Sequence, residues 1–491
     1  MSKEAINFLD RTHGLWVNGE WVQSTSESFI DVIDPATGEV ISAISNASQE
    51  DLDSCVLAAR RALDGAAWSD ITPATRSLLL HKLADLIDEN GEELAYLETL
   101  DNGMPLSISQ SIAVGASVNC CRYYAGWADK INGTTVPISS MPGDYHAYTL
   151  KEPIGVVGLI VPWNFPLVMA IMKIAPALAA GCTCILKPAE DTSLTALRIG
   201  ELAAQAGIPA GVLNVLTGYG SGVGVGIASH PDIDKVAFTG STVTGKAVVR
   251  AASVNLKRVS LELGGKAPNI ILPDAELDAA VPASAMGVFF NSGQVCTAAS
   301  RLYIHDDIYD EVIERLLTFV KNIEVGPGLA SSSVLGPLVS AKQQQQVMSF
   351  IAKGREEGAE VLVGGKTMGE KGFFVQPTVM AVTEQDMTVV QEEIFGPVLV
   401  VQRFSSVDEV VEMANDSKYG LSAYVWTNRL ADSHKIVKRL DAGIIGVNVA
   451  AAADWDLPLG GFKQSGWGRE NGLEGLLNYL QTKSVVASLE G

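Results

Sequence analysis

Cys296 lies in a segment that suits covalent chemistry better than packing. Glycine and glutamine come just before it in the segment 289–301, and threonine and two alanines follow it. Such small and polar neighbours are typical of a loop in which a reactant approaches the sulfur closely. Earlier in the chain a single carboxylate, Glu262, is embedded in an apolar strand pattern that ends in the pair Gly264 and Gly265. A thiol nucleophile and a carboxylate base are therefore the first candidates for catalysis.

The composition indicates a compact globular protein with more than one domain. The chain has 491 residues, of which 47% are hydrophobic and 19% are charged, so two or three domains are expected. The formal net charge of -21 argues against a nucleic-acid partner, because the field of the protein repels phosphates. The same charge argues against docking on an anionic membrane.

The cysteines and the apolar segments indicate a reducing compartment. The six cysteines form no disulfide framework and no CxxC pattern, so those other than Cys296 are interpreted as core thiols. Residues 1–11 lack the apolar core of a secretory signal, and the longest apolar stretch, 174–186, is interrupted by Pro176 and Gly181. We therefore expect no membrane association and a cytoplasmic location.

The first third of the chain predicts a hairpin, several helices and an irregular excursion. Residues 15–17 lead into Asn18–Gly19, a hairpin turn, and Ser48 with Asp51 forms a capping box at the start of a helix over 48–64. Helical periodicity continues over 73–100 and 107–131. Residues 132–148 are polar and rich in proline, glycine and serine, which favours a projecting hairpin.

From residue 154 onward the pattern alternates between strands and helices. Strands are expected at 155–161, 183–187, 212–216, 235–239 and 258–263, with helices at 167–180, 192–206, 221–229 and 244–253. This alternation predicts an α/β fold with a parallel, doubly wound sheet that binds ligands at the carboxyl ends of its strands. A second α/β series runs from about 268 to 447, so a domain boundary is expected near Gly264 and Gly265. The tail 482–489 reads as a strand that could pair with another subunit.

One segment resembles a nucleoside-triphosphate loop but lacks an essential group. Residues 240–247 nearly match the pattern GxxxxGK[ST] between a strand and a helix, but Ala247 has no hydroxyl to hold Mg²⁺. We therefore reject an NTPase. The segment still predicts nucleotide binding, because N–H groups at the start of a helix can bind a pyrophosphate.

Seven blocks in order then resemble the aldehyde dehydrogenase superfamily. They are 162–166 (PWNFP), 187–190 (KPAE), 238–242 (FTGST), 262–266 (ELGGK), 293–296 (GQVC), 392–397 (EEIFGP) and 460–466 (GGFKQSG). The resemblance implies a fold of two doubly wound Rossmann-like domains with a small β oligomerisation element. Its implied limits are 1–131 with 151–264 for the NAD-binding domain, 265–466 for the catalytic domain, and 132–150 with 467–491 for the oligomerisation element.

The resemblance implies oxidation of an aldehyde to an acid. Cys296 would attack the aldehyde carbon, and the Asn164 amide with the Cys296 N–H would hold the oxyanion. Glu262 would activate the water that hydrolyses the thioester, and a carboxylate in an apolar strand should have the raised pKa that this role needs. Glu470 matches a position that some members use to relay the proton from Glu262. A surface ion pair of Glu470 with Arg469 or another cation is the alternative.

The resemblance also implies the cofactor. Lys187 and Glu190 would bind the adenosine ribose, and the Glu190 carboxylate would repel a 2′-phosphate, so NAD is favoured over NADP. No metal is expected. The implied cofactor residues are Val161, Pro162, Trp163, Lys187, Glu190, Gly220, Gly240, Ser241, Leu263, Glu393 and Phe395.

The residues expected at the substrate entrance indicate a roomy apolar funnel. Met172 and Ala453 stand where some relatives carry tryptophan or another bulky aromatic, and this favours a hydrophobic or arylalkyl aldehyde. The segment 8–15 is similar to that of phenylacetaldehyde dehydrogenase-like bacterial enzymes. The expected funnel residues are Phe165, Met169, Met172, Phe290, Ala453 and Trp455.

Two other functions share this fold. A CoA-acylating dehydrogenase would keep the cysteine, but such relatives generally lack a glutamate at the position of Glu262. A non-catalytic binding or structural protein would be expected to lose Cys296, Asn164 or Glu262. The excursion and the tail match oligomerisation elements of the family, so a homodimer or homotetramer is expected.

Overall fold

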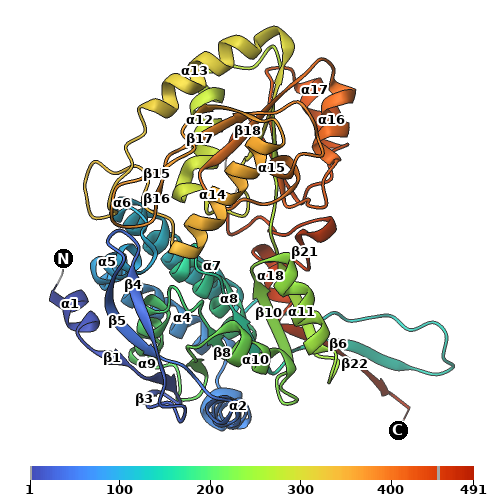
Figure 1. The fold of residues 1–491 in the computed structure, drawn as a ribbon. Helices are drawn as coiled ribbons and strands as arrows, with labels where there is room; N and C mark the ends of the chain where they lie inside the picture. Colours follow the sequence, from blue (N-terminus) through green and yellow to red (C-terminus); the bar gives the residue numbers. More distant parts are fainter. Residues whose placement is uncertain (1–2, 451–453, 491) are drawn as a thin grey trace.

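The computed structural model describes residues 3–450 and 454–490, which form two α/β bodies and a projecting two-stranded ribbon (Figure 1). No helix in this described part is long and apolar enough to cross a membrane. The first body contains most of the N-terminal half of the chain. The second contains the segment between β12 (Pro268–Ile271) and β20 (Ile444–Val447).

The first body is built on an eight-stranded sheet with a parallel centre. Its order is β21-β11-β10-β7-β8-β9-β2-β3, and the strands β21 and β2–β3 at its edges run antiparallel to their neighbours. The strands are β2 (Leu15–Val17), β3 (Glu20–Val22), β7 (Val156–Ile160), β8 (Thr183–Lys187), β9 (Leu213–Val215), β10 (Lys235–Thr239), β11 (Arg258–Glu262) and β21 (Gly466–Trp467). A separate three-stranded sheet joins β1 (Thr12–His13), β5 (Glu39–Ser45) and β4 (Phe29–Asp34).

Helices cover both faces of this sheet because side chains alternate along each buried strand. In β7, Val157 and Leu159 join one hydrophobic cluster, while Val156 and Ile160 join the other. The first cluster is covered by α4 (Pro73–Glu89), α5 (Gly91–Asn102), α7 (Gly115–Trp127), α8 (Pro166–Ala180) and α9 (Leu194–Gln205), and the second by α2 (Gln49–Asp64), α10 (Val225–Ser229) and α11 (Thr242–Ala252). Shorter helices are α1 (Lys3–Leu9), α3 (Ala66–Ser69), α6 (Leu106–Ile108) and α18 (Gly472–Leu477).

The second body repeats this design with seven strands in the order β14-β17-β18-β13-β12-β19-β20, parallel except for β14. Its other strands are β13 (Arg301–His305), β14 (Glu360–Val363), β17 (Thr378–Ala381), β18 (Val398–Phe404) and β19 (Ser422–Trp426), with β15 (Thr367–Met368) and β16 (Phe374–Val375) paired beside them. Its helices are α12 (Leu277–Phe289), α13 (Tyr309–Lys321), α14 (Ala341–Glu356), α15 (Thr388–Gln391), α16 (Val407–Asn415) and α17 (Leu430–Val437).

The ribbon joins two distant parts of the chain. β6 (Tyr145–Pro153) and β22 (Leu480–Ser488) pair antiparallel along their whole length and extend away from both bodies (Figure 1). The C-terminal strand predicted at 482–489 is therefore present, and within the chain it pairs with β6. The excursion before β6 folds back on this strand through an antiparallel bridge between Thr135 and Tyr148, with the Val136 N–H donating to the Ala147 carbonyl and the Thr149 N–H donating to the Thr134 carbonyl.

The predicted fold class is confirmed, and the predicted strands and helices of the first body's core agree with the structure to within two residues, except that the helix predicted at 221–229 is a π-helical segment, Gly220–Gly224, followed by the short helix α10. The capping box at Ser48 and the hairpin turn at Asn18–Gly19 are also present. The single helix predicted over 73–100 is wrong. The Asn90 amide donates to the Leu86 carbonyl at 2.7 Å and ends α4, after which α5 starts anew.

The helix predicted over 107–131 is only partly right. It contains a π-helical segment, Ser109–Val114, and ends at Trp127. The predicted boundary near Gly264 falls between β11 and β12, and the predicted domain limits remain predictions.

Gly158 provides a test of how tightly α10 packs on the sheet. A Cβ at this position in β7 would lie 2.3 Å from Cγ2 of Ile227 in α10. We expect Gly158→Ala to lower the melting temperature, with a loss of unfolding free energy of about 1–3 kcal/mol, because a filled core cannot accept the methyl group. Gly126→Ala is the matched control, since nothing lies within 4 Å of its added Cβ. Equal melting temperatures for the two variants would contradict this packing argument.

Candidate active site

The cysteine loop is held in an unusual backbone conformation. Asn291, Ser292 and Gly293 have φ values of 48°, 55° and 75°, so the chain turns sharply between α12 and Cys296. A Cβ on Gly293 would lie 2.0 Å from the Gly396 carbonyl oxygen, which explains the glycine. The Ser292 hydroxyl donates to the Gly336 carbonyl at 2.7 Å. These contacts present Cys296, which is half-buried, in a turn at the surface of a cavity.

Asn164 connects the first body to this loop. It lies between β7 and α8, is 3% exposed, and its Nδ2 donates to the Gln294 carbonyl at 2.9 Å. In return, Nδ2 of Asn291 donates to the Asn164 carbonyl at 2.8 Å. Nδ2 of Asn164 carries a second hydrogen, so the same amide can also donate to a reacting oxygen. The oxyanion role of Asn164 remains a prediction.

Glu262 ends β11 in a buried position, 6% exposed, and its Oε2 has no hydrogen-bond partner among the described residues. Burial and then the charge of Glu470 raise the pKa of Glu262 well above its ordinary value, against the opposing effect of Lys173 and Arg469. The raised pKa expected from the sequence is therefore found. A carboxyl group of this kind can accept a proton near neutral pH.

The surroundings of Cys296 raise the pKa of its thiol. Burial, and then the charges of Glu393 and Glu262, raise its pKa to about 12, although the N–H groups of Cys296 and Thr297 favour the thiolate. The thiol must therefore lose its proton to a base before or during attack. Glu262 and Cys296 border the same cavity.

Glu470 forms an ion pair in the interior. It is 7% exposed and pairs with Nζ of Lys173 in α8. The predicted alternative, a surface ion pair with Arg469 or another cation, is right that a cation pairs with Glu470 but wrong about the surface, because the carboxylate lies inside, where the fully buried Lys173 needs a counter-charge. Its role as a proton relay remains a prediction.

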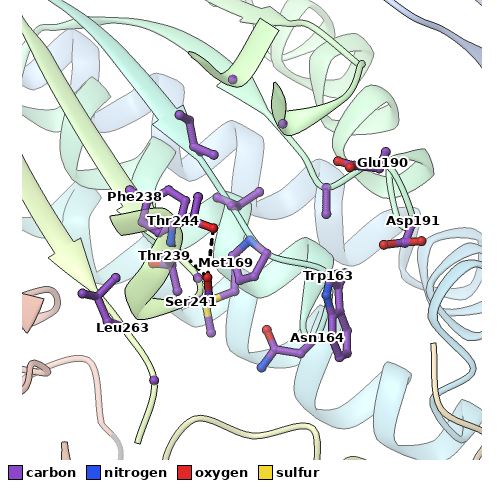
Figure 2. Close-up of a pocket in the computed structure, with 18 of the residues that line it drawn as sticks. Trp163, Asn164, Met169, Glu190, Asp191, Phe238, Thr239, Ser241, Thr244 and Leu263 are labelled. Carbon is purple, nitrogen blue, oxygen red and sulfur yellow. Dashed lines mark hydrogen bonds between the residues drawn. The ribbon is translucent and has the colours of Figure 1, made fainter. Parts of the chain in front are cut away.

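All the predicted cofactor residues border one cavity of about 650 Å³, which also contains Cys296, Glu262 and Asn164. Gly240 and Ser241 lie at the start of α11, where the Ser241 hydroxyl accepts from the Thr244 N–H (Figure 2). Nζ of Lys187 donates to Oε2 of Glu190 at 3.0 Å. Figure 2 shows Trp163 beside Asn164 and near Asp191 and Glu190, with Phe238, Ser241 and Leu263 on the other side of the view.

Two groups of cavity residues were missed in the sequence. Val225 and Ala228 of α10, with Val248 and Ala251 of α11, form an apolar wall, and Val225 is 51% exposed. Their i, i+3 spacing on both helices was a readable signal. The first turns of α14 also contribute, and Nε2 of Gln343 donates to the Phe395 carbonyl at 2.7 Å. Nothing in the local pattern of α14 indicates this contact.

The predicted funnel residues are only partly together. The rings of Phe165 and Phe290 stack with centroids 6.1 Å apart, and Met169 borders the cavity. Met172 instead packs beside Tyr124 and Glu470. Trp455 is half-buried against the same hydrophobic cluster as Phe290, and Ala453 lies outside the described residues. The funnel remains a prediction.

Comparison with known proteins shows the family. The model of the Aldehyde dehydrogenase family matches residues 21–485. The chain is 46% identical over 490 residues to phenylacetaldehyde dehydrogenase of Pseudomonas fluorescens, covering 99% of this chain and 98% of that protein. It is 45% identical over 474 residues to mitochondrial aldehyde dehydrogenase of Mesocricetus auratus, covering 96% and 94%.

Solved structures agree with this result. The NAD+ complex structure of aldehyde dehydrogenase from Bacillus cereus matches with a TM-score of 0.98 and 46% identity, covering 100% of this chain and 99% of that one. The chain belongs to the aldehyde dehydrogenase family. The predicted enzyme class, an oxidoreductase that acts on aldehydes, is thereby confirmed.

The raised pKa of Cys296 can be tested by alkylation. In the enzyme without cofactor, the rate of Cys296 modification by iodoacetamide should rise by roughly tenfold per pH unit between pH 7 and 9, because only the thiolate reacts. Mass spectrometry of the Cys296 peptide measures this rate, with Cys296→Ser as the control for the five buried cysteines. A plateau below pH 9 would show that the thiol is already ionised.

Proposed function

We propose that this enzyme oxidises a hydrophobic or arylalkyl aldehyde to its carboxylic acid with NAD+, through a covalent thioester on Cys296 that water hydrolyses. One observation carries the proposal. Cys296, Glu262 and Asn164 border the same cavity as all eleven residues expected to bind the dinucleotide.

The cavity has features that fit NAD+. Gly220, which borders the cavity, has open space where a side chain would stand, and Gly240 precedes a helix start whose N–H groups favour a pyrophosphate. The apolar wall between α10 and α11 suits the flat face of a base. A relative of known structure is an NAD+ complex. NAD is therefore the cofactor, held by Lys187 and Glu190 at one ribose and by Glu393 and Phe395 at the other.

The ionisation of Glu190 supports NAD over NADP. Burial opposes the ionised form, but the charge of Lys187 and N–H donors, including that of Gly220, lower the pKa of Glu190 below its ordinary value. An ionised carboxylate accepts a hydrogen bond from a 2′-hydroxyl and repels a 2′-phosphate.

The chain's own groups account for the chemical steps. Sγ of Cys296 bonds to the aldehyde carbon as its proton leaves to a base, and the Asn164 amide stabilises the resulting oxyanion. The nicotinamide of NAD+, which Glu393 and Phe395 would hold at its ribose, would supply the acceptor for the hydride on that carbon, and loss of this hydride leaves a thioester on Cys296. Glu262 then takes a proton from water, whose oxygen attacks the thioester and releases the acid and the Cys296 thiolate. The buried pair of Lys173 and Glu470 gives this proton a route away from Glu262.

The substrate class rests on the apolar groups near Cys296. Phe165 and Phe290 form a stacked pair, and Met169 is a flexible apolar neighbour. A relative at 46% identity is named phenylacetaldehyde dehydrogenase. These features support an apolar or aromatic aldehyde over a charged one.

The ribbon supports a homodimer or homotetramer, whereas the cytoplasmic location rests on the six cysteines, all of which are free. Leu150 and Val486 on its two strands are 41% and 52% exposed, and a two-stranded ribbon leaves unpaired strand edges that a second copy can cover.

Cofactor and substrate can be tested together by absorbance of the reduced nicotinamide. We expect turnover of phenylacetaldehyde and hexanal with NAD+, weaker or no turnover with NADP+, and low activity on betaine aldehyde. Cys296→Ala should remove the activity, because no other described group near the cavity can form the thioester. Activity with NADP+ alone would overturn the Glu190 argument.

Hydrolysis by Glu262 predicts a particular kinetic pattern. Glu262→Gln should still release about one equivalent of reduced cofactor per active site in a rapid burst. Steady-state turnover should then fall by roughly 10²–10⁴-fold, because the thioester persists without a general base. Stopped-flow absorbance measures both phases. If the wild-type enzyme turns over only when CoA is added, it belongs to the acylating class instead.

A further inference from the structure

The end of α5 carries three polar side chains in the interior of the protein. Glu98, Asp101 and Asn102 are 0%, 1% and 0% exposed, and neither acid forms an ion pair with a cation in the described part of the chain. Burial raises the pKa of Glu98 to about 7 and that of Asp101 well above its ordinary value. Groups that lose hydration in this way need compensating hydrogen bonds, and the location of those bonds is informative.

Glu98 binds the first turns of two helices. Its Oε1 accepts from the Leu167 N–H at 3.2 Å, and its Oε2 accepts from the Thr195 hydroxyl at 3.0 Å. Leu167 is the second residue of α8, whose early N–H groups have no partner within the helix. Asn164 lies just before the start of this helix. The position of the Asn164 amide therefore depends on a bond that Glu98 makes.

Asp101 and Asn102 continue this arrangement toward the cofactor. Oδ2 of Asp101 accepts from the N–H of Leu194, the first residue of α9, at 2.9 Å. The segment that leads into α9 contains Lys187 and Glu190. Nδ2 of Asn102 donates to the Trp163 carbonyl at 2.7 Å, next to Asn164. In Figure 2, Trp163 and Asn164 lie together, whereas Glu190 and Asp191 mark the other segment that α5 holds.

The same turn also contacts the support of the cysteine loop. Gly103, with φ of 91°, ends α5 against Gly336, where an added Cβ would lie 2.0 Å from the Gly103 oxygen. The Gly336 carbonyl accepts from Ser292, and the Val339 N–H donates to Oε1 of Gln294 at 2.9 Å. One turn of α5 thus contacts three segments of the chain. They are the segment with Asn164, the segment with Lys187 and Glu190, and the segment at Gly336 that supports the loop of Cys296.

We propose that Glu98, Asp101 and Asn102 are positioning residues for the reaction proposed above, on which this inference rests. Glu98 and Asn102 set the Asn164 amide against Cys296. Asp101 sets the segment of Lys187 and Glu190 against the cofactor ribose. Asp101 bonds the start of α9, whereas Glu98 bonds the start of α9 and also that of α8, next to Asn164, and this second bond assigns the effect on kcat to Glu98.

The separate roles of Glu98 and Asp101 can be tested by measuring kcat and NAD+ binding independently in variants of each residue. Glu98→Leu should lower kcat about tenfold or more, with the KM for NAD+ within about threefold of wild type, because misplacement of an oxyanion donor acts on the transition state. Asp101→Leu should raise the KM for NAD+, and its Kd by calorimetry in the absence of aldehyde, about tenfold. Glu98→Gln and Asp101→Asn should behave like wild type, since each keeps the oxygen acceptor.

Two further variants separate positioning from folding. Asp51 is a control, a buried carboxylate that accepts from Ser24, Thr25 and Ser48 and does not border the cavity, so Asp51→Asn should leave both kcat and Kd unchanged. Thr195→Val removes only one donor to Glu98 and should lower kcat in the same direction as Glu98→Leu, by less. It keeps the test available if a Leu variant does not fold.

Different results would contradict the positioning role and the proposed function. Equal changes in kcat and Kd in both Leu variants, or a fall only in the fraction of active sites counted by the burst of reduced cofactor, would reduce these residues to a structural role. A wild-type enzyme that binds NAD+ but oxidises no aldehyde would instead refute the proposed function. The effect of Asp101→Leu on the Kd would still decide the binding half of the inference.

Discussion

The site depends on a pair of reciprocal hydrogen bonds across the two bodies. The Asn164 side chain donates to the backbone of the cysteine loop, and the Asn291 side chain of that loop donates back to the Asn164 backbone. The first bond fixes the amide, and the second fixes the loop that carries the thiol. Because both bonds are buried, breaking one leaves polar groups without water and costs about 1–3 kcal/mol. The left-handed backbone at Asn291 is retained because it brings these groups into register.

Burial and the charges around Glu262 raise its pKa, so that its carboxylate is a stronger base than an exposed one. Glu470 is neutralised by Lys173, while a second buried lysine, Lys235, donates to Ser260 in the same strand as Glu262. Burial, and then the charge of Lys173, lower the pKa of Lys235 to about 7. Acids with raised pKa values and amines with lowered ones can exchange protons at little energetic cost. This arrangement suits a base that must be reset in every cycle.

The site residues that could be predicted from the sequence are those whose reactive group stands in a distinctive local pattern. Cys296 was marked by its small neighbours, Glu262 by its apolar strand, and the nucleotide loop by glycine and serine before a helix. The partner of Glu470 could not be predicted, because Lys173 lies 297 residues away in sequence and a buried lysine in an apolar helix resembles a surface one. The break at Asn90 was missed because both helices keep the same periodicity across it. The contribution of α14 depends on how the two bodies meet, which no local pattern contains.

The order in which the chain is made has a consequence for β21 and β22. Both strands belong with elements formed early: β21 pairs with β11, and β22 pairs with β6. The whole second body is synthesised between these partners, since β21 begins at Gly466. During translation the first sheet therefore lacks its edge strand β21 until the second body has been synthesised. Glu470 arrives with that last segment, so the nascent chain can assemble its nucleotide cavity well before it acquires the counter-charge of Lys173.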